Sequence, residues 1–152
     1  MDLVFGTYPS WSLLIVRVAL GVIFSAHGAQ KCFGWFGGYG LKGTIGYFQQ
    51  ALRIPPALTV LAALTECFGG LLVLVGFLAR PAALGLAVVM ITAVAKVHWP
   101  SGFFLNWSLE HGKGHGYEMN LALLAMCAAV MVGGAGAVSV DRLIVPWGSL
   151  PE

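Results

Sequence analysis

Long apolar stretches alternate with short polar or glycine-rich connections along the whole chain. About 20 apolar residues in a helix are enough to cross the roughly 30 Å hydrocarbon core of a lipid bilayer. Four stretches meet this length, and they run from about residue 11 to 30, 57 to 78, 81 to 99 and 117 to 138. The pattern therefore predicts four transmembrane helices.

The connections between these stretches differ greatly in length. Only Ala79-Arg80 separates the second stretch from the third, which predicts a tight antiparallel hairpin, whereas the first and third connections are long and rich in Gly, Trp and Phe. An even number of spans places both long loops on one membrane face and both termini on the other. We therefore expect an all-α membrane protein, a four-helix transmembrane bundle with two long loops on the same membrane face, forming a single domain over residues 1–152.

Basic residues are unevenly divided between the two expected faces. Arg80 and Arg142 belong to the side of the termini, and the long-loop side has the larger set of Lys31, Lys42, Arg53, Lys96 and Lys113. Loops rich in Lys and Arg tend to stay in the cytoplasm. The sequence thus predicts cytoplasmic long loops.

Composition supports a lipid environment and excludes several classes of protein. The chain is 59% hydrophobic and 9% charged, whereas soluble domains are about 25% charged. A net charge of +2 without clusters of Lys and Arg argues against a nucleic-acid partner. The three cysteines form no Cys-x-x-Cys pair, so no disulfide framework or cysteine-built zinc site is expected. Cys67 and Cys127 lie inside apolar stretches, and only Cys32 is expected near a membrane surface.

Two ionisable residues lie inside predicted spans, where each costs at least a few kcal/mol and by default indicates a partner. Arg17 stands about ten residues before the loop-side end of the first helix, and Glu66 about ten residues after the loop-side start of the second. At 1.5 Å per residue both would lie roughly 15 Å below the same face. Equal depth predicts a buried Arg17–Glu66 ion pair, with either a structural or a functional role.

A second set of ionisable residues gathers near the loop-side ends of the helices. The candidate catalytic residues are His27, Lys31, His98 and Glu118, with Lys96 at the same mouth. Imidazole titrates near neutral pH and suits proton transfer. Lys31 could instead extend to lipid headgroups, and Glu118 is favoured at a helix N-terminus with or without chemistry. No second His pair is expected on a facing helix, so neither haem nor a metal is predicted.

The order and spacing of these residues, taken together, resemble those of a known protein family. The first helix and loop resemble those of the DoxX family through Arg17, Gly21, Phe24, His27, Gly28 and Lys31, followed by Gly34-Trp35-Phe36. The resemblance continues through Glu66, Gly69-Gly70-Leu71-Leu72, Gly76, Arg80-Pro81, Ala95, His98 and Gly102-Phe103-Phe104. It closes on Gly134-Ala135-Gly136, Ser139 and Asp141, and so covers nearly the whole chain.

The resemblance implies a four-helix protein of the bacterial inner membrane. Founding members of the family are subunits of a thiosulfate:quinone oxidoreductase, and others are membrane partners of enzymes for oxidative or thiol stress. The chain has no recognisable flavin, haem or iron–sulfur motif, so a quinone is the expected cofactor if the protein is redox-active. The leading hypothesis is a membrane component of a quinone-linked oxidoreductase, possessing a quinone or lipophile site near the loop-side mouth.

Two alternatives stay open on the sequence alone. The bundle could be a membrane scaffold that recruits a soluble or membrane-bound redox partner protein through its loops. It could also be a carrier of small solutes, gated by the central ion pair, and four helices per chain would then require a homo-oligomer. All three hypotheses place the chain in membrane lipid.

Overall fold

The computed structural model describes residues 2–145, and helices with no strand make up the regular structure of this part. Four of the elements are short turns of other helix types: η1 and η4 are 3₁₀ turns, and η2 and η3 are π-helical turns. The order is α1 (Asp2–Phe5), α2 (Trp11–Phe33), η1 (Trp35–Gly37), α3 (Gly40–Ala51), α4 (Pro56–Leu64), η2 (Thr65–Gly69), α5 (Gly70–Val75), α6 (Ala79–Ala93), η3 (Val94–His98), η4 (Trp99–Ser101), α7 (Glu118–Gly133) and α8 (Val140–Ile144).

Three continuous helical rods are long and apolar enough to cross a membrane, within residues 2–145. They are Trp11–Phe33, Pro56–Val75 and Ala79–Ser101. The all-α membrane class is thereby confirmed. The fourth predicted span is the shorter apolar helix α7, which has 16 residues. At 1.5 Å per residue this is about 24 Å, against a hydrocarbon core of about 30 Å, so the count of four spans stays a prediction.

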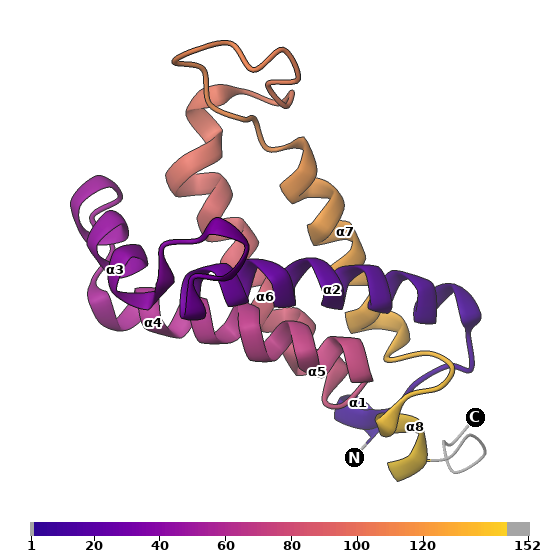
Figure 1. The fold of residues 1–152 in the computed structure, drawn as a ribbon. Coiled ribbons are helices and arrows are strands. Elements are labelled where there is room, and N and C mark those ends of the chain that lie inside the picture. Colours follow the sequence, from indigo (N-terminus) through magenta and orange to yellow (C-terminus); the bar gives the residue numbers. More distant parts are fainter. Residues whose placement is uncertain (1, 146–152) are drawn as a thin grey trace.

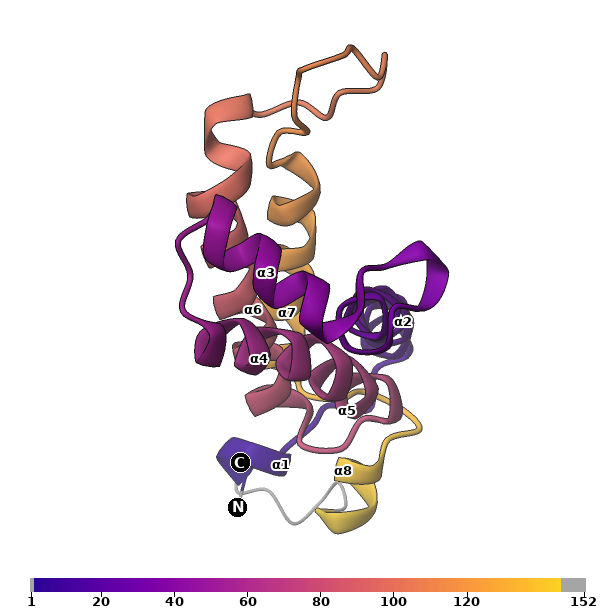
Figure 2. The same ribbon diagram turned by 60° about the vertical axis from the view of Figure 1, so that its left-hand side comes forward.

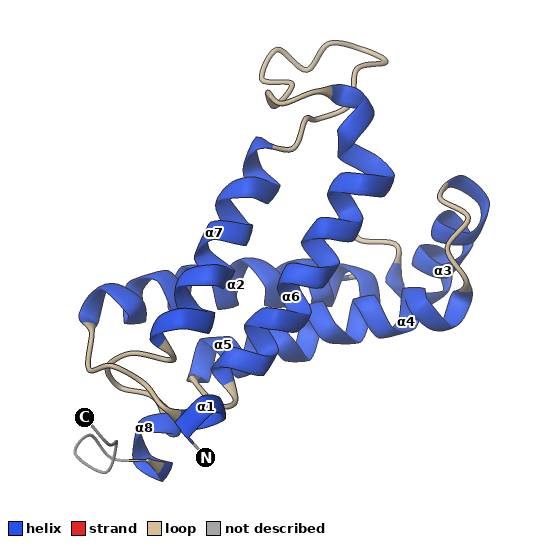
Figure 3. Cartoon of the chain, turned by 180° about the vertical axis from the view of Figure 1, so that it is seen from behind, coloured by secondary structure: helices blue, strands red, loops and turns tan. Residues whose placement is uncertain are grey.

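The helices form two antiparallel pairs that cross steeply. Figure 1 shows α2 running beside α4 and α5, while α6 and α7 extend away from them, and Figure 2 shows α2 end-on against the long axes of α6 and α7. The view from behind shows α6 and α7 together (Figure 3). Where the pairs meet, the buried core contains Leu20, Phe24, Leu86, Cys127 and Val130.

Figure 1 shows the two long connections at different places, the first at the far end of α2 and the second at the top beyond α6 and α7, both away from α1 and α8. Their location on one membrane face stays a prediction. The first contains a helix that the sequence did not predict, α3, next to the end of α2. The second, between Gly102 and Tyr117, is tied to the start of α7 by the backbone of Phe103, which accepts a hydrogen bond from the N–H of Glu118 at 2.9 Å.

Small residues set the register between α2 and the second rod. A Cβ built on Gly28 would lie 2.2 Å from the backbone N of Cys67, and one on Gly21 would lie 2.7 Å from the backbone of Leu74. Only glycine permits this approach, since a larger residue would push the backbones apart. The register therefore places the last turns of α2 beside η2, and its first turns beside the end of α5.

Two helix ends differ from the expected bounds. The second rod ends at Val75 because Gly76 takes a left-handed φ of 70°, so the connection to α6 lies at residues 76–78 rather than at Ala79-Arg80. Helix α7 ends at Gly133 rather than near residue 138, because Gly134 has a φ of 77° and leads into a glycine-containing loop.

Candidate functional site

The predicted ion pair between Arg17 and Glu66 is wrong. Glu66 pairs with Lys31, and the described residues give Arg17 a different set of partners. The prediction assumed that the two residues lie at equal depth on neighbouring helices. In the actual register Glu66 lies level with the last turns of α2, and Arg17 lies level with the end of α5.

Arg17 bonds to backbone carbonyls where two segments end. Its Nη1 donates to Leu74 O at 2.5 Å and Val73 O at 3.3 Å, and its Nη2 donates to Val138 O at 2.8 Å and Ala137 O at 3.4 Å. The last carbonyls of a helix have no partner within the helix. A buried guanidinium that satisfies carbonyls of α5 and of the loop before α8 holds these segments together, which is a structural role.

Asp141 binds backbone groups at the same end of the molecule as Arg17. Its carboxylate accepts the backbone N–H groups of Leu78 and Ala79, at 2.7 and 3.0 Å, at the start of α6. Burial raises the pKa of the Asp141 carboxyl, whereas these N–H groups and the nearby guanidinium groups of Arg17 and Arg80 oppose the shift. Arg80 donates to the backbone of Gly6 and Met131. We call Arg17, Arg80 and Asp141 the terminal charge cluster.

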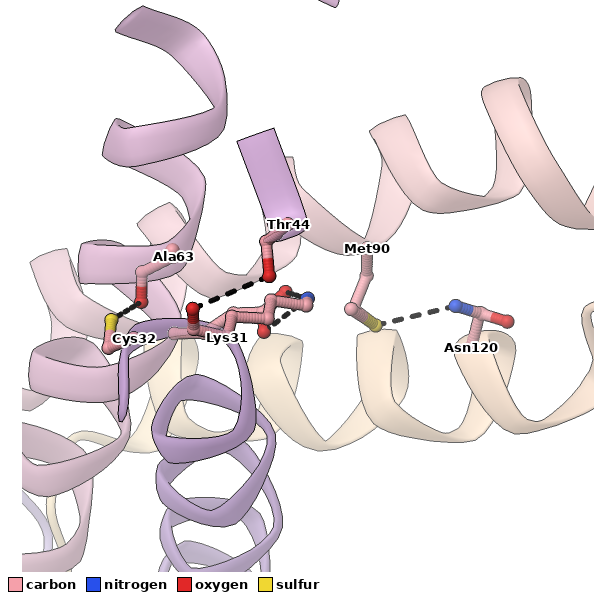
Figure 4. Close-up of polar contacts among 7 residues, drawn as sticks. Lys31, Cys32, Thr44, Ala63, Met90 and Asn120 are labelled. Atoms are coloured by element: carbon pink, nitrogen blue, oxygen red, sulfur yellow. Dashed lines mark hydrogen bonds and ion pairs between the residues drawn. The ribbon is translucent and has the colours of Figure 1, made fainter. Parts of the chain in front are cut away.

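At the other end, Lys31 forms an ion pair with Glu66 through both carboxylate oxygens. Figure 4 shows the extended Lys31 side chain, with the Thr44 hydroxyl of α3 donating to the Lys31 carbonyl O at 3.4 Å. Glu66 is 1% exposed and Lys31 is 27% exposed. The Lys31 Nζ also lies 5.9 Å from the centre of the Phe48 ring on α3, within the range of a cation–π contact.

The ion pair lies on the wall of a cavity of about 600 Å³. The cavity is bounded by α2, α3, the loop of residues 52–55, α4, η2, α6 and η3, and most of its lining is aliphatic. Leu58, Leu61 and Val88 line it and are also 54%, 60% and 56% exposed on the outside of the chain. The cavity is therefore open at a part of the surface that is itself apolar.

Three cationic side chains and one carboxylate line this cavity. Arg53 and Lys96 lie on its wall together with Lys31 and Glu66. A ligand that accepts hydrogen bonds or carries a negative charge would find donors and cationic groups on the wall of an otherwise apolar space. Ligand pockets have this composition, with mainly apolar walls and a few polar groups that orient the ligand.

Both π-helical turns of the described chain border the cavity. Thr65 and Glu66 come from η2, and Lys96 and Val97 come from η3. A π turn holds one extra residue in the helix, which rotates the side chains that follow, and such turns are frequent at functional sites. Here each of them carries one of the charged groups of the wall.

The other candidate catalytic residues lie outside this cavity. His27 is exposed on α2, and His98 is half-buried with its Nδ1 2.9 Å from the carbonyl O of His115. Glu118 is half-buried at the first residue of α7. Of the four, Lys31 alone lines the cavity. The roles predicted for His27, His98 and Glu118 stay predictions.

Sequence reasoning missed the contributions of Arg53, Phe48 and Thr65. Arg53 and Phe48 belong to the long first loop, whose helix α3 was not expected, and they reach the cavity only because α3 folds back over the end of α2. The amphipathic pattern of residues 40–51 was the signal that could have revealed this helix. No cluster of three or more His, Cys, Asp or Glu side chains suited to a metal occurs among residues 2–145.

Fold and site together define an α-helical membrane protein whose apolar cavity carries a lysine–glutamate pair. The DoxX family model matches residues 12–99, which is more than half of the 152 residues. The chain belongs to the DoxX family.

Two curated relatives carry names that bear on function or location. Putative oxidoreductase CatD of Bacillus subtilis (strain 168) is 30% identical over 98 residues, which cover 64% of this chain and 68% of the relative. Inner membrane protein YphA of Escherichia coli (strain K12) is 28% identical over 145 residues, which cover 91% of this chain and 94% of the relative. No solved structure matches the chain significantly.

Proposed function

We propose that this protein is a multi-pass inner-membrane component of a quinone-linked oxidoreductase, and that the cavity beside Lys31 and Glu66 holds the quinone head. The observation that carries the proposal is the cavity itself: about 600 Å³ of mainly apolar space, open at an apolar surface, with one ion pair on its wall. The similarity to a relative named as an oxidoreductase supports the redox class.

The residues of the cavity suit a quinone head in shape and in polarity. A quinone has an apolar ring with two carbonyl oxygens, and these accept hydrogen bonds. Lys31 has three N–H donors, and Lys96 and Arg53 offer further donors on the same wall. The aliphatic side chains of α4 and α6 would contact the ring and the start of the isoprenoid tail.

Proton supply is the second requirement, because the reduction of a quinone to a quinol consumes two electrons and two protons. Glu66 and Lys31 share a proton-rich contact at the cavity wall. The Lys31 ammonium group carries a proton that it can donate to a neighbouring quinone oxygen, which is the role of a general acid, and the Glu66 carboxylate holds it in place. Lys31 is partly exposed, so a proton lost from the pair can be replaced from outside.

The electrons would come from an anionic sulfur donor such as thiosulfate, or from a partner protein. Two thiosulfate ions that join through a new S–S bond to form tetrathionate release two electrons, which balances one quinone. The cationic wall formed by Lys31, Lys96 and Arg53 would attract such an anion. A redox partner protein would deliver the same two electrons from outside the chain.

The test is reduction of a soluble quinone analogue by purified protein in lipid nanodiscs, with thiosulfate or a small thiol as donor. We expect reduction by the wild type and a loss of at least tenfold in Lys31→Met. Lys113→Met is the matched control, because Lys113 pairs with Glu110 on the exposed second loop and its loss should leave the rate unchanged.

Two results would contradict the proposal. One is the absence of both quinone reduction with any donor and quinone in the lipid extract of the purified protein. The other is equal rates in Lys31→Met and Lys113→Met. A stable soluble partner recovered from native membranes, without any quinone bound, would support the scaffold function instead.

A further inference from the structure

Two cysteines meet where α2 packs against η2. The Sγ of Cys32 donates to the carbonyl O of Ala63 at 3.5 Å (Figure 4), and Ala63 lies one helical turn before Cys67. The sequence placed Cys67 in an apolar stretch and Cys32 near a membrane surface, and gave no sign that the two are neighbours. The third cysteine, Cys127, is buried on α7.

Helix geometry explains this contact. Gly28 lies against the backbone of Cys67, and Cys32 follows Gly28 by one turn, whereas Ala63 precedes Cys67 by one turn. Side chains on a helix tilt toward its N-terminus. Because the two helices are antiparallel, Cys32 tilts toward the level of Cys67, and Cys67 tilts toward the level of Cys32. The two cysteines therefore lie within about one helical turn of each other across the glycine contact.

The two thiols differ in accessibility in the way that a redox pair requires. Cys67 is 5% exposed, whereas Cys32 is half-buried in the last turn of α2. A reactant from outside can reach Cys32 and form a mixed disulfide with it. The buried Cys67 is then positioned to attack this mixed disulfide and displace the reactant. Lys31 and Glu66 are the sequence neighbours of Cys32 and Cys67.

We propose that Cys32 and Cys67 form a reversible dithiol–disulfide pair that exchanges with small disulfides and thiols. In the oxidising direction Cys32 attacks one sulfur of a small disulfide and releases one thiol. Cys67 then attacks the mixed disulfide at Cys32 and releases the second thiol. One S–S bond is broken, one is formed, and the two cysteine protons leave with the two thiols. The inference does not rest on the proposed quinone chemistry.

Equilibration of the purified full chain in glutathione buffers tests the pair. Samples in detergent are brought to equilibrium at a series of reduced-to-oxidised glutathione ratios and quenched with acid. Remaining thiols are then labelled with a maleimide under denaturing conditions, and the digested protein is analysed by mass spectrometry. We expect two of the three thiols to disappear together, with a cross-linked peptide that joins Cys32 to Cys67.

Three serine variants give the controls. Cys127→Ser should keep the two-thiol transition at the same glutathione ratio, whereas Cys32→Ser and Cys67→Ser should each lose the intramolecular cross-link. Size-exclusion profiles equal to that of the wild type show that a variant has folded, and cross-link formation in folded Cys127→Ser tests the pair independently of the other two variants.

Several outcomes would overturn the proposal. These are three thiols that stay reduced at the most oxidising ratio, a glutathione adduct on Cys32 that is never resolved by Cys67, and a bridge that includes Cys127. Quinone reduction by Cys32→Ser tests only the quinone function proposed above. Failure of the disulfide proposal and failure of the quinone proposal can therefore be told apart.

Discussion

The two ends of this molecule use buried charge in different ways. In the terminal charge cluster, Arg17 and Asp141 bond to backbone carbonyl and N–H groups. At the cavity end, Lys31 and Glu66 bond to each other and face an open space. Charged groups that bond to the backbone hold segments in place, whereas charged groups that face a cavity can bind a ligand.

This difference separates a structural role from a ligand-binding role, and the sequence alone does not distinguish the two roles. Arg17 and Glu66 are both ionisable residues inside apolar stretches, where the cost of burial indicates an important role. Only their neighbours decide which role. The comparison therefore predicts that changes at one end affect mainly stability, and changes at the other affect mainly ligand binding.

Arg17→Met should have the largest effect on stability. The change removes the guanidinium donor from the carbonyls of Val73, Leu74, Ala137 and Val138, of which Val73 keeps the N–H of Gly76 at 3.1 Å. Hydrogen bonds to a charged group contribute about 1.5–3 kcal/mol, so a loss of about 3 kcal/mol is expected, or about 10 °C in melting temperature for a chain of this size. Arg53→Met is the control, and thermal unfolding in detergent is the measurement. Equal melting temperatures of Arg17→Met and Arg53→Met would show that Arg17 does not stabilise the fold.

Glu66→Gln should have a smaller effect on stability. Removal of one partner from a fully buried ion pair costs about 3–5 kcal/mol, but Lys31 is 27% exposed and can turn toward water. A loss of about 1–2 kcal/mol is therefore expected. A double-mutant cycle with Lys31→Met measures the interaction between the two side chains. A cycle free energy near zero would show that they do not interact in the folded protein.

The smallest effect concerns the pH dependence of the terminal charge cluster. Burial raises the pKa of the folded-state Asp141 carboxyl, so the folded protein binds this proton more tightly than the unfolded chain. The stability from this proton is fully present below the ordinary pKa of aspartate and is lost as pH rises through the raised pKa. Melting temperatures of the wild type and Asp141→Asn should therefore differ in slope across this acidic window. Melting temperatures of the two proteins that change in parallel with pH would contradict a raised pKa of Asp141.

The helical class and most helix bounds were predictable because they depend on local hydropathy. The spans starting near Trp11, Pro56 and Ala79 follow from runs of apolar residues that need lipid around them. The end of α7 was not predictable from hydropathy, because residues 134–138 are as apolar as the helix before them. The left-handed backbone of Gly134 ends the helix there.

The candidate site was harder to predict because it depends on register. Lys31 was identified as a candidate and does line the cavity, yet its partner was expected to be elsewhere. Glu66 pairs with Lys31 rather than with Arg17 because the close contact of Gly28 with Cys67 places η2 beside the last turns of α2. Sequence spacing alone gives depths along each helix, and a shift of a few turns between two helices exchanges one ion pair for another.

Affinity for a soluble quinone analogue, measured on the wild type, Lys31→Met and Arg17→Lys, tests the contrast between the two ends most directly. Loss of one charge-assisted hydrogen bond, about 1.5–3 kcal/mol, corresponds to a dissociation constant raised about 10–100-fold. We predict this increase for Lys31→Met. For folded Arg17→Lys we predict an unchanged dissociation constant with a lower melting temperature. An unchanged affinity in Lys31→Met, or a loss of affinity in folded Arg17→Lys, would contradict the account.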